Sequence, residues 1–501
     1  MDEALARLRE RLQEIDDLEC AAGLLYWDQS TYMPKAGAPA RARQLSTLSR
    51  LAHQKFIDPA VGRLLDELAK REAEWPPDSD EAALVRVTRR DYERAVKVPA
   101  DFMAEFTRHG AETYDAWTRA RPANDFQAVA PLLKRTVELS RRYADFFPGY
   151  EHIADPLIDA TDEGMTVAAL RPLFAELREG LAPLVETIAS QPPADDACLR
   201  GDFAEDRQIA FAVDVVRRFG YDFDRGRLDR TPHPFMIRFS SGDVRITTRV
   251  KPGFLGEALF SILHEAGHAL YEQGVPARFE GTPLAAGATS GVHESQSRLW
   301  ENLVGRSRPF WERFFPKLKK AFPDALRDAS LDDFYRAINK VERSLIRTDA
   351  DEVTYNLHVI IRFDLELALL EGRLDVEHLP EAWNEAYRNT LGVAPPDDRD
   401  GALQDMHWYN GAVGGAFQCY AIGNVLAAQF FDAATRAAPD IMEDMRRGEF
   451  ASLLTWLRAN VHAHGRALDA KALINRATGR DLSVRPYLDY LQRKYGELYN
   501  L

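Results

Sequence analysis

Cysteine is scarce in this sequence, and long apolar runs are missing from it. Cys20, Cys198 and Cys419 lie far apart among 501 residues and form no C-x-x-C pair. This excludes a zinc site built from cysteines and fits a reducing compartment. No stretch reaches the ~18 uncharged apolar residues that a transmembrane helix needs. The segment Met1–Glu19 is rich in acids and bases and has no apolar signal core, so we expect a cytoplasmic protein without a membrane partner.

Basic clusters are missing as well. The formal net charge is −14, and Arg141-Arg142 and Arg446-Arg447 are only short basic pairs. A surface that reads the backbone of a nucleic acid needs clustered Lys and Arg, so the sequence argues against a nucleic-acid partner. The acidic excess indicates a soluble surface that repels its own copies.

What the sequence does contain is helical periodicity. Apolar residues recur at three- and four-residue spacing among abundant Ala, Leu, Glu and Arg, and clusters of Pro, Asp and Gly separate the segments. Hydrophobic residues make up 46% of the chain, enough for a large core. We expect an all-α protein with a single domain over residues 1–501. The predicted helices include Met1–Glu19, Pro39–Gln54, Pro59–Ala73, Pro99–Thr118, Ala128–Phe146, Val167–Ser190, Asp206–Phe219 and Pro252–Gly274.

One stretch departs from the helical pattern. Pro234–Val250 contains two short β-prone runs around Ser-Ser-Gly-Asp, which is a hairpin signal. We expect strands at Met236–Phe239 and Val244–Arg249. A small sheet beside an active-site helix can offer an unpaired edge to an extended peptide.

Residues 264–268 read H-E-A-G-H within the predicted helix Pro252–Gly274. Histidines four residues apart share one face of a helix, about 6 Å apart, so His264 and His268 can bind one metal ion. Glu265 lies one residue further round, where its carboxylate can act on a water molecule as general base. By chance such a pattern arises in roughly two chains per hundred of this composition, so it needs support from other residues.

A catalytic zinc ion takes three protein ligands and keeps one position for water. Glu272 continues the histidine row, but it lies ~12 Å along the helix from the first histidine, too far to share an ion with it. A loop follows, and a second helix is expected to begin at His293. Glu294 near its start is the favoured third ligand, and Glu301 is the alternative. The competing interpretation of Glu294 is a solvated acid at a helix N-terminus.

Short motifs elsewhere in the chain carry further information. They are L-L-Y-W-D-Q-S-T-Y-M-P (Leu24–Pro34), H-P-F (His233–Phe235), D-x-R-x-T (Asp243–Thr247), H-E-S-Q (His293–Gln296), I-R-x-x-A-D (Ile346–Asp351), G-x-x-Q-D-x-H-W (Gly401–Trp408) and R-A-T-G-R-D-L (Arg476–Leu482). In content and order they resemble the signatures of the carboxypeptidase Taq family of metallocarboxypeptidases. The likeness covers essentially the full length.

The resemblance implies a mainly helical, saddle-like subunit with a deep active-site cleft, built here from about 233–425, and a homodimer. It implies release of single residues from the C-termini of peptides with broad preference. The family's third ligand is the Glu of H-E-S-Q, which corresponds to Glu294. Zinc is the expected metal, and such enzymes often work with cobalt or manganese in its place.

The chain departs from the family pattern after its H-W pair. Many members read roughly G-Y-F-P-T-Y-x-L-G there, whereas Gly415–Gly423 reads G-A-F-Q-C-Y-A-I-G. Tyr420 keeps its place, but Ala416 and Gln418 replace a tyrosine and a proline. Any contribution of that tyrosine to substrate binding must be made differently here.

An exopeptidase has to recognise a free carboxylate, and arginine offers it a planar, bidentate partner. Arg347 is the favoured residue for this role and Arg245 in the hairpin is the next. Each has a structural alternative. Arg347 could pair with Asp349, Asp351 or Asp405, and Arg245 with Asp243.

The remaining candidates concern the tetrahedral intermediate. His407 or Tyr420 could donate to its oxyanion, and Asp405 could support His407 from behind. His407 could equally be a core histidine beside Trp408. His293 is expected to support or pack against the metal ligands, because neighbours on a helix point about 100° apart.

Two other classes of function remain open at this stage. One is a different peptidase, an oligoendopeptidase or a dipeptidyl carboxypeptidase in a similar helical cleft, which would release larger pieces. The other is a non-enzymatic helical scaffold with a relic metal site. The intact Glu265 argues against the relic, which would have no use for a general base.

Overall fold

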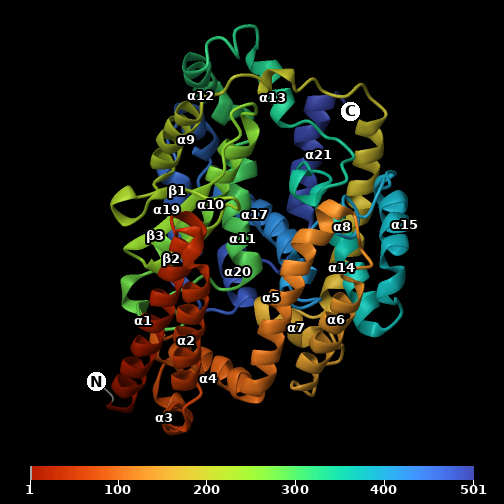
Figure 1. Ribbon diagram of the computed structural model, residues 1–501. Coiled ribbons are helices and arrows are strands. Elements are labelled where there is room, and N and C mark those ends of the chain that lie inside the picture. Colours follow the sequence, from red (N-terminus) through yellow and green to blue (C-terminus); the bar gives the residue numbers. More distant parts are fainter. Residues whose placement is uncertain (1–2) are drawn as a thin grey trace. The chain divides into compact units, whose positions relative to one another are not determined.

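The computed structural model describes residues 3–501 and is drawn in Figure 1. Helices make up most of it, and the one sheet in these residues has three short strands, so the predicted fold class is confirmed. Met1 and Asp2, at the start of the first predicted helix, lie outside the described residues. The predicted single domain, saddle-like outline and cleft stay predictions.

The chain divides into two compact units, each assembled from three separated stretches. The first unit comprises Met1–Val96, Asp196–Ile338 and Ala427–Leu482, and the second comprises Lys97–Asp195, Asn339–Leu426 and Ser483–Leu501. Two helices cross these boundaries, α4 (Asp80–Lys97) and α17 (Gln418–Ala437).

The first unit holds the sheet and the H-E-A-G-H helix. Most of its longer helices begin and end within a few residues of the predicted limits. The first helix is the exception, because it was predicted to end at Glu19 and continues to Thr31. Its further helices are α1 (Glu3–Thr31), α2 (Ala38–Phe56), α3 (Pro59–Ala69), α9 (Glu205–Phe219), α10 (Gly256–Gly274), α11 (Ser290–Arg298), α12 (Arg308–Ala321), α13 (Leu331–Ile338), α18 (Ile441–Arg447), α19 (Ala451–Asn460) and α20 (Ala470–Thr478). Short 3-10 turns are η1 (Lys35–Gly37), η2 (Glu72–Glu74), η3 (Ala197–Leu199), η4 (Phe223–Arg225), η5 (Ala277–Phe279) and η9 (His462–His464).

The predicted hairpin is present and has an additional neighbour. Strands β2 (Met236–Ser240) and β3 (Asp243–Thr248) are antiparallel, with Met236 opposite Ile246. A third strand, β1 (Leu228–Arg230), runs parallel to β3 on its other side, which makes the order β1-β3-β2. Strand β1 was not predicted, because three residues, two of them charged, show no strand periodicity.

Helix α10 is buried along most of its length. Its apolar residues pack on one side against α9 and β3, and even Glu265 and Glu272 are largely hidden from solvent. Nearby, Trp300, Phe310 and Trp311 have no exposed surface and belong to one aromatic cluster with Phe219, as the sequence predicted for a core.

Helix α11 follows a loop that is shorter than expected. It begins at Ser290 rather than His293, because the Thr289 side chain accepts a hydrogen bond from the backbone N–H of Val292 and caps the helix. After Arg298 the helix widens into a π-helical turn, η6 (Leu299–Val304). Such turns re-aim the side chains that follow and often occur at functional sites.

The second unit is helical throughout its described elements. It contains α5 (Ala100–Ala123), α6 (Ala130–Asp145), α7 (Asp155–Thr161), α8 (Val167–Ala189), α14 (Tyr355–Glu371), α15 (Leu379–Leu391), α16 (His407–Asn410) and α21 (Arg485–Tyr499), with 3-10 turns η7 (Arg347–Asp349) and η8 (Val376–His378). Its core is rich in large buried rings, including Trp383, Tyr387 and Trp408. Across residues 3–501, no helix combines the length and apolarity needed to cross a membrane.

Gly267 permits the close packing of α10 against α11. A Cβ atom at this position would lie 2.5 Å from the carbonyl oxygen of Gln296 and 2.6 Å from the Cα of Ser297. Both neighbours are backbone atoms, which cannot rotate away as a side chain could. The two helices can therefore approach this closely only where α10 has no side chain.

We predict that Gly267→Ala forces α10 and α11 apart and lowers the free energy of unfolding by about 1–3 kcal/mol, as overpacking does. The matched control is Gly496→Ala, also inside a helix, where a Cβ atom would meet no atom within 4 Å. There alanine should stabilise by about 0.5–1 kcal/mol. Thermal unfolding of both variants tests this, and equal unfolding temperatures would show that the approach is not constrained at Gly267.

Candidate metal centre

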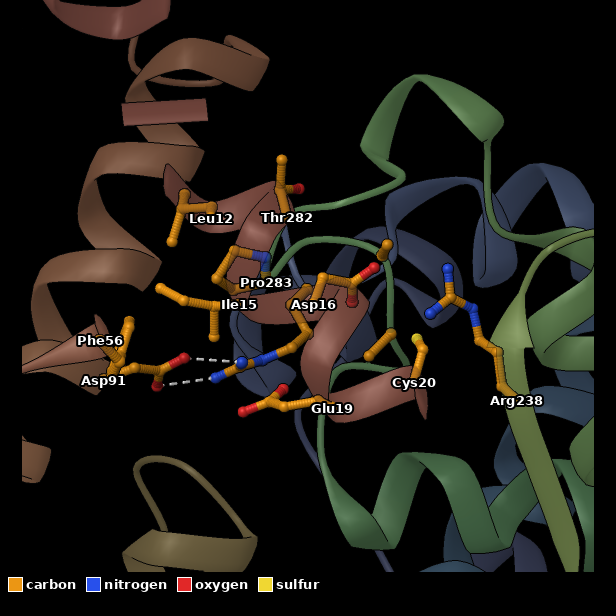
Figure 2. A pocket seen from close by; sticks show the side chains of 13 residues that line it. Leu12, Ile15, Asp16, Glu19, Cys20, Phe56, Asp91, Arg238, Thr282 and Pro283 are labelled. Atoms are coloured by element: carbon orange, nitrogen blue, oxygen red, sulfur yellow. Dashed lines mark hydrogen bonds and ion pairs between the residues drawn. The ribbon is translucent and has the colours of Figure 1, made fainter. Parts of the chain in front are cut away.

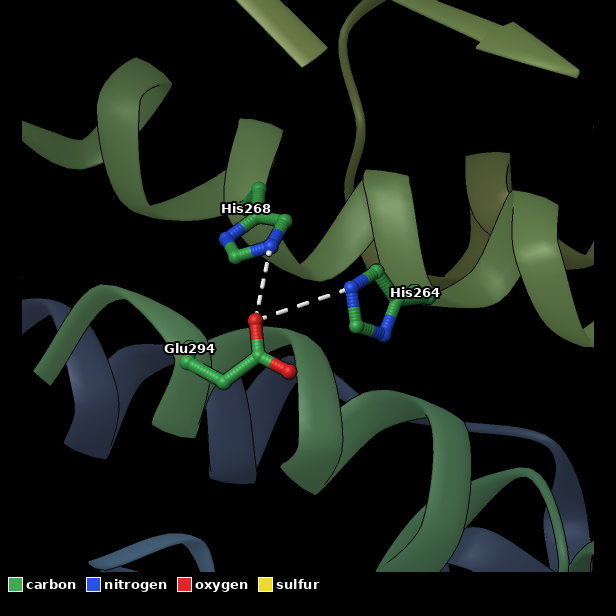
Figure 3. A group of neighbouring side chains, drawn as sticks. All are labelled: His264, His268 and Glu294. Carbon is green, nitrogen blue, oxygen red and sulfur yellow. Dashed lines mark ion pairs between the residues drawn. The ribbon is translucent and has the colours of Figure 1, made fainter. Parts of the chain in front are cut away.

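Two histidines of α10 and one glutamate of α11 converge in the first unit (Figure 3). The rings of His264 and His268 lie with their centroids 4.9 Å apart. One carboxylate oxygen of Glu294 lies 3.7 Å from Nε2 of His264 and 3.4 Å from Nε2 of His268. The three donor atoms lie within 4.8 Å of one another.

This spacing suits a small divalent cation. Zinc binds imidazole nitrogen and carboxylate oxygen at about 2.0–2.2 Å in a tetrahedron, which sets neighbouring donor atoms about 3.3–3.6 Å apart. The two distances to Glu294 are close to that edge length. Burial also lowers the pKa of His268 to about 3, so its ring is neutral and can offer a lone pair. The donor set therefore fits a small divalent cation.

The second carboxylate oxygen of Glu294 is already engaged. It accepts a hydrogen bond from Nε of Arg298 at 2.7 Å, four residues along the same helix. Burial alone would raise the pKa of Glu294, but the Arg298 guanidinium and the His264 ring hold it far below its usual range. Glu294 is thus a buried carboxylate with one oxygen free to bind a cation.

Glu301, the alternative ligand, lies behind the histidine and outside the trio. Its carboxylate accepts a hydrogen bond from Nδ1 of His264 at 2.9 Å, and Arg298 binds the same oxygen at 3.1 Å. The carboxylate fixes the ring so that the Nε2 lone pair points toward Glu294. Glu301 reaches this position from the π-helical turn η6.

A longer chain of hydrogen bonds supports His268. Its Nδ1 lies 2.6 Å from Nδ1 of His293, and Nε2 of His293 lies 2.8 Å from the carboxylate of Glu272. If His268 binds metal through Nε2, its Nδ1–H donates to His293, which in turn donates to Glu272. His293 therefore lies where it can support His268, as expected.

Arg238 of β2 extends this chain toward a separate cavity. Its guanidinium lies 3.4 Å from Glu272 and donates to Glu280 at 2.9 Å. The cavity, about 390 Å³ in volume, is shown in Figure 2 with the Asp91–Arg466 ion pair on its wall. None of its lining residues belongs to the metal trio.

Glu265 is buried next to His264 but differs from the other acids of the site. Across residues 3–501 no donor is found for its carboxylate, and burial raises the pKa of Glu265 to about 7. A carboxyl group that titrates near neutrality and has no partner is suited to accept and return a proton.

Arg347, His407 and Tyr420 lie in the second unit. Arg347 is buried, and its Nε and one terminal nitrogen bind the same oxygen of Asp405 at 2.9 and 2.8 Å. Its other terminal nitrogen donates to the hydroxyl of Tyr355 at 2.8 Å. Of the three structural alternatives, Asp405 is thus its partner. One N–H on each terminal nitrogen remains for another acceptor.

Asp405, His407 and Tyr420 form a hydrogen-bonded row. The other Asp405 oxygen accepts from Nδ1 of His407, so Nε2 of His407 accepts from the hydroxyl of Tyr420 at 3.1 Å. Gln418, at the departure from the family pattern, is buried and donates to Thr161 at 2.9 Å. It anchors the start of α17 where other members have proline.

Arg245 in the hairpin has the structural partner that the sequence offered as its alternative. It binds both oxygens of Asp243 at 2.8 Å and lies over the ring of Trp27, 4.3 Å from the centroid. Its planar face and its fork are both in use, which leaves Arg347 as the better candidate for binding a carboxylate.

Arg298 binds both Glu294 and Glu301, and this role was not predicted. It lies four residues after Glu294 and three before Glu301, the spacings at which side chains on one helix meet. That spacing was visible in the sequence and predicts the pairing. Glu272 was excluded as a ligand, and its contact with His293 comes from packing that no spacing rule shows.

A helical fold in which an H-E-x-x-H pair faces a glutamate of the next helix defines a metallopeptidase. Residues 7–495 match the family described as Carboxypeptidase Taq (M32) metallopeptidase. The chain belongs to this family of metallocarboxypeptidases.

Similar proteins cover its whole length. Thermostable carboxypeptidase 1 of Thermus thermophilus is 45% identical over 506 residues, 99% of each chain. Carboxypeptidase 1 of Bacillus subtilis is 38% identical over 491 residues, 98% of this chain and 97% of its own. The crystal structure of the M32 carboxypeptidase from Deinococcus radiodurans R1 superposes with a TM-score of 0.97 at 50% identity, covering 100% of both chains.

We predict that Glu294→Ala abolishes stoichiometric metal binding, because two histidines remain for an ion that takes three protein ligands. Glu301→Ala should weaken binding by about 10–100-fold without abolishing it, since it removes only the support of His264. A metal titration of both variants measures this. If Glu301→Ala is the more severe change, the ligand and the supporting residue have been exchanged.

Proposed function

We propose that the protein removes single amino acids from the free C-termini of peptides, with broad preference. In this proposal one divalent cation, zinc in the first instance, with cobalt or manganese as substitutes, binds His264, His268 and Glu294. The observation that carries it is the convergence of these donors beside Glu265, a buried carboxyl with no described hydrogen-bond donor.

The mechanism assigns a proton transfer to Glu265. A divalent cation at the trio supplies Lewis acidity, which makes a water molecule more acidic and polarises the scissile carbonyl. Glu265 takes the proton of the attacking water on its carboxylate and then delivers it to the leaving amine. Its pKa, raised by burial to about 7, suits both transfers. Arg298 and Glu301 hold Glu294 and His264 in place during these steps.

Recognition of the peptide terminus is assigned to Arg347. A free carboxylate distinguishes the substrate of an exopeptidase, and a guanidinium binds it through paired hydrogen bonds. Arg347 retains one N–H on each terminal nitrogen after its contacts with Asp405 and Tyr355. Asp405 and Tyr355 also hold the guanidinium rigid, so little conformational entropy is lost on binding.

The oxyanion of the tetrahedral intermediate needs a donor. We assign it to the pair His407 and Tyr420, whose side chains are hydrogen-bonded to each other. Because Asp405 holds the Nδ1 proton of His407, reorientation of the Tyr420 hydroxyl toward an oxyanion leaves that ring in place.

We further assign the enzyme to the cytoplasm, as a homodimer. No disulfide joins the three cysteines of the described chain, which supports a reducing compartment. The homodimer rests on the resemblance to the family.

Product size tests this function against an oligoendopeptidase or a dipeptidyl carboxypeptidase. One peptide and its C-terminally amidated twin are incubated with zinc-, cobalt- and manganese-loaded enzyme, and the products are identified by mass spectrometry. Successive loss of single residues from the free acid, with slow cleavage of the amide, is expected. Release of dipeptides or internal fragments would assign a different peptidase activity.

We predict that Glu265→Gln keeps its metal and loses about 10²–10⁴-fold in kcat, the usual contribution of a general base. Glu257→Gln, a matched change in the first turn of the same helix, should leave kcat within about twofold. Metal content is measured alongside kcat. If Glu265→Gln has a normal metal content and keeps more than about a tenth of the wild-type kcat, Glu265 is not the general base.

We predict that Arg347→Ala lowers kcat/KM on free-acid peptides by about 10–150-fold, the loss expected for a charge-assisted hydrogen bond worth roughly 1.5–3 kcal/mol. Amidated peptides carry no terminal charge, so their slow hydrolysis should change little. Arg347→Lys should recover only part of the loss, because an ammonium group lacks the forked geometry.

Arg245→Ala is the control for this experiment, since its guanidinium is occupied by Asp243 and Trp27. It should leave the preference for acid over amide unchanged. If the preference survives in Arg347→Ala and disappears in Arg245→Ala, the hairpin arginine binds the terminus instead.

A further inference from the structure

Arg362 of α14 is a fully buried arginine within the second unit. Its side chain has no exposed surface. Aromatic rings enclose the guanidinium, whose carbon lies 4.0 Å from the ring centroid of Trp408, 4.2 Å from that of Phe417 and 5.3 Å from that of Trp383. No ligand could reach it without moving these rings.

The guanidinium of Arg362 makes no hydrogen bond to any residue that the structure describes. All three of its nitrogens are buried without an acceptor. The nearest carboxylate oxygen, Oδ2 of Asp405, lies 3.8 Å from one terminal nitrogen. Contact with aromatic faces offsets part of the desolvation of a cation, but a buried charge without hydrogen bonds remains costly. Stability therefore gives no reason for an arginine here.

The charges around Arg362 do not balance. Two carboxylates act on it, Asp405 and Glu366, and burial raises the pKa of Glu366 to about 7, so near neutrality that group is only partly ionised. Asp405 is the one fully charged anion, and it is shared with Arg347 and His407. Two guanidiniums thus face one carboxylate, and the cluster holds an excess of positive charge.

We propose that Arg362 is a positioning residue that keeps Arg347 available for the terminal carboxylate of the peptide. Without Arg362, Asp405 and Arg347 would form a closed, neutral pair with little attraction for a second carboxylate. With it, the buried cluster lacks one anion, and the substrate's terminal carboxylate supplies that anion. This inference rests on the proposed role of Arg347. In it, Arg362 acts through its positive charge and makes no contact with the substrate.

The role predicts an unusual combination of effects for Arg362→Met, which removes the charge and keeps an unbranched, apolar side chain. Asp405 keeps Arg347 and His407, and Glu366 keeps the indole N–H of Trp408, so no acceptor loses a hydrogen bond. The thermal unfolding temperature should be unchanged or higher. KM for free-acid peptides should rise about tenfold or more, kcat should stay within about twofold, and amidated peptides should be unaffected.

Arg362→Lys separates charge from shape. Arg362 donates no hydrogen bond, so an ammonium in its place should retain most of the preference for acid over amide. At Arg347 the same substitution should lose most of that preference. Steady-state kinetics on acid and amide peptides, with unfolding temperatures for each variant, supply all the values needed.

Three outcomes overturn the inference. One is an Arg362→Met variant that fails to fold or unfolds at a clearly lower temperature, which would make the residue structural. Another is a stable Arg362→Met enzyme with an unchanged acid preference while Arg347→Ala loses it. The third is a Lys variant as impaired as the Met variant. If Arg347→Ala itself keeps the preference, the proposed terminal clamp fails first, and the two failures are thus distinguishable.

Discussion

The contact between the backbones of α10 and α11 at Gly267 is the constraint on which the metal centre depends. Because no side chain separates the helices there, His264 and His268 come within reach of Glu294 on the facing helix. The same proximity lets Glu301, a little further along, support His264 from behind. Gly267, between the two histidines, thus has a geometric function. A larger residue at this position would push α10 from α11 and so move both histidines away from Glu294.

The two charged clusters of the molecule use the same design with opposite signs. Around the trio Glu294 and Glu301 share the guanidinium of Arg298, and the other oxygen of Glu294 faces the two histidine rings, which suits a site for a cation. In the second unit the guanidiniums outnumber the fully ionised carboxylate, which suits a site for an anion. Arg298 is shared between two carboxylates in the first cluster, and Asp405 between two guanidiniums in the second. Each cluster therefore keeps a charge that a ligand of opposite sign can balance. Full pairing would stabilise each cluster and remove its attraction for that ligand.

The sequence predicted those features that depend on spacing along one element. The helical period predicted α10 and the shared face of His264 and His268, and the two β-prone runs around Ser-Ser-Gly-Asp predicted β2 and β3. It did not predict β1, which is too short to show a period, or the start of α11, which depends on a single cap at Thr289. Among contacts between elements, it offered the approach of Glu294 to the histidines and the pairing of Arg347 with Asp405. It did not predict the contact of Glu301 with His264 or that of His293 with Glu272.

Glu301 and Arg362 are residues that the sequence marks as unusual but whose contacts it does not predict. Spacing alone made Glu301 a possible ligand, and only the packing of η6 against α10 places its carboxylate on the other nitrogen of His264. Arg362 interrupts the apolar run Val359–Phe363, which is a visible sign of a buried charge. Its neighbours, by contrast, come from distant parts of the chain and could not be named.

The interleaving of the two units along the chain has a consequence for biosynthesis. The first unit needs residues up to Leu482 and the second up to Leu501, where Lys494 binds the buried Glu352 and the hydroxyl of Tyr499 binds the backbone of Val341. Neither unit has its full set of segments until the ribosome has translated past Ala427 for the first and past Ser483 for the second. Domains that are contiguous in sequence can fold one after another as they emerge. Here the apolar faces of the early helices stay uncovered until the later segments of the same unit are made. The nascent chain is therefore exposed to aggregation until these last segments emerge, and holding chaperones have a long interval in which to bind it.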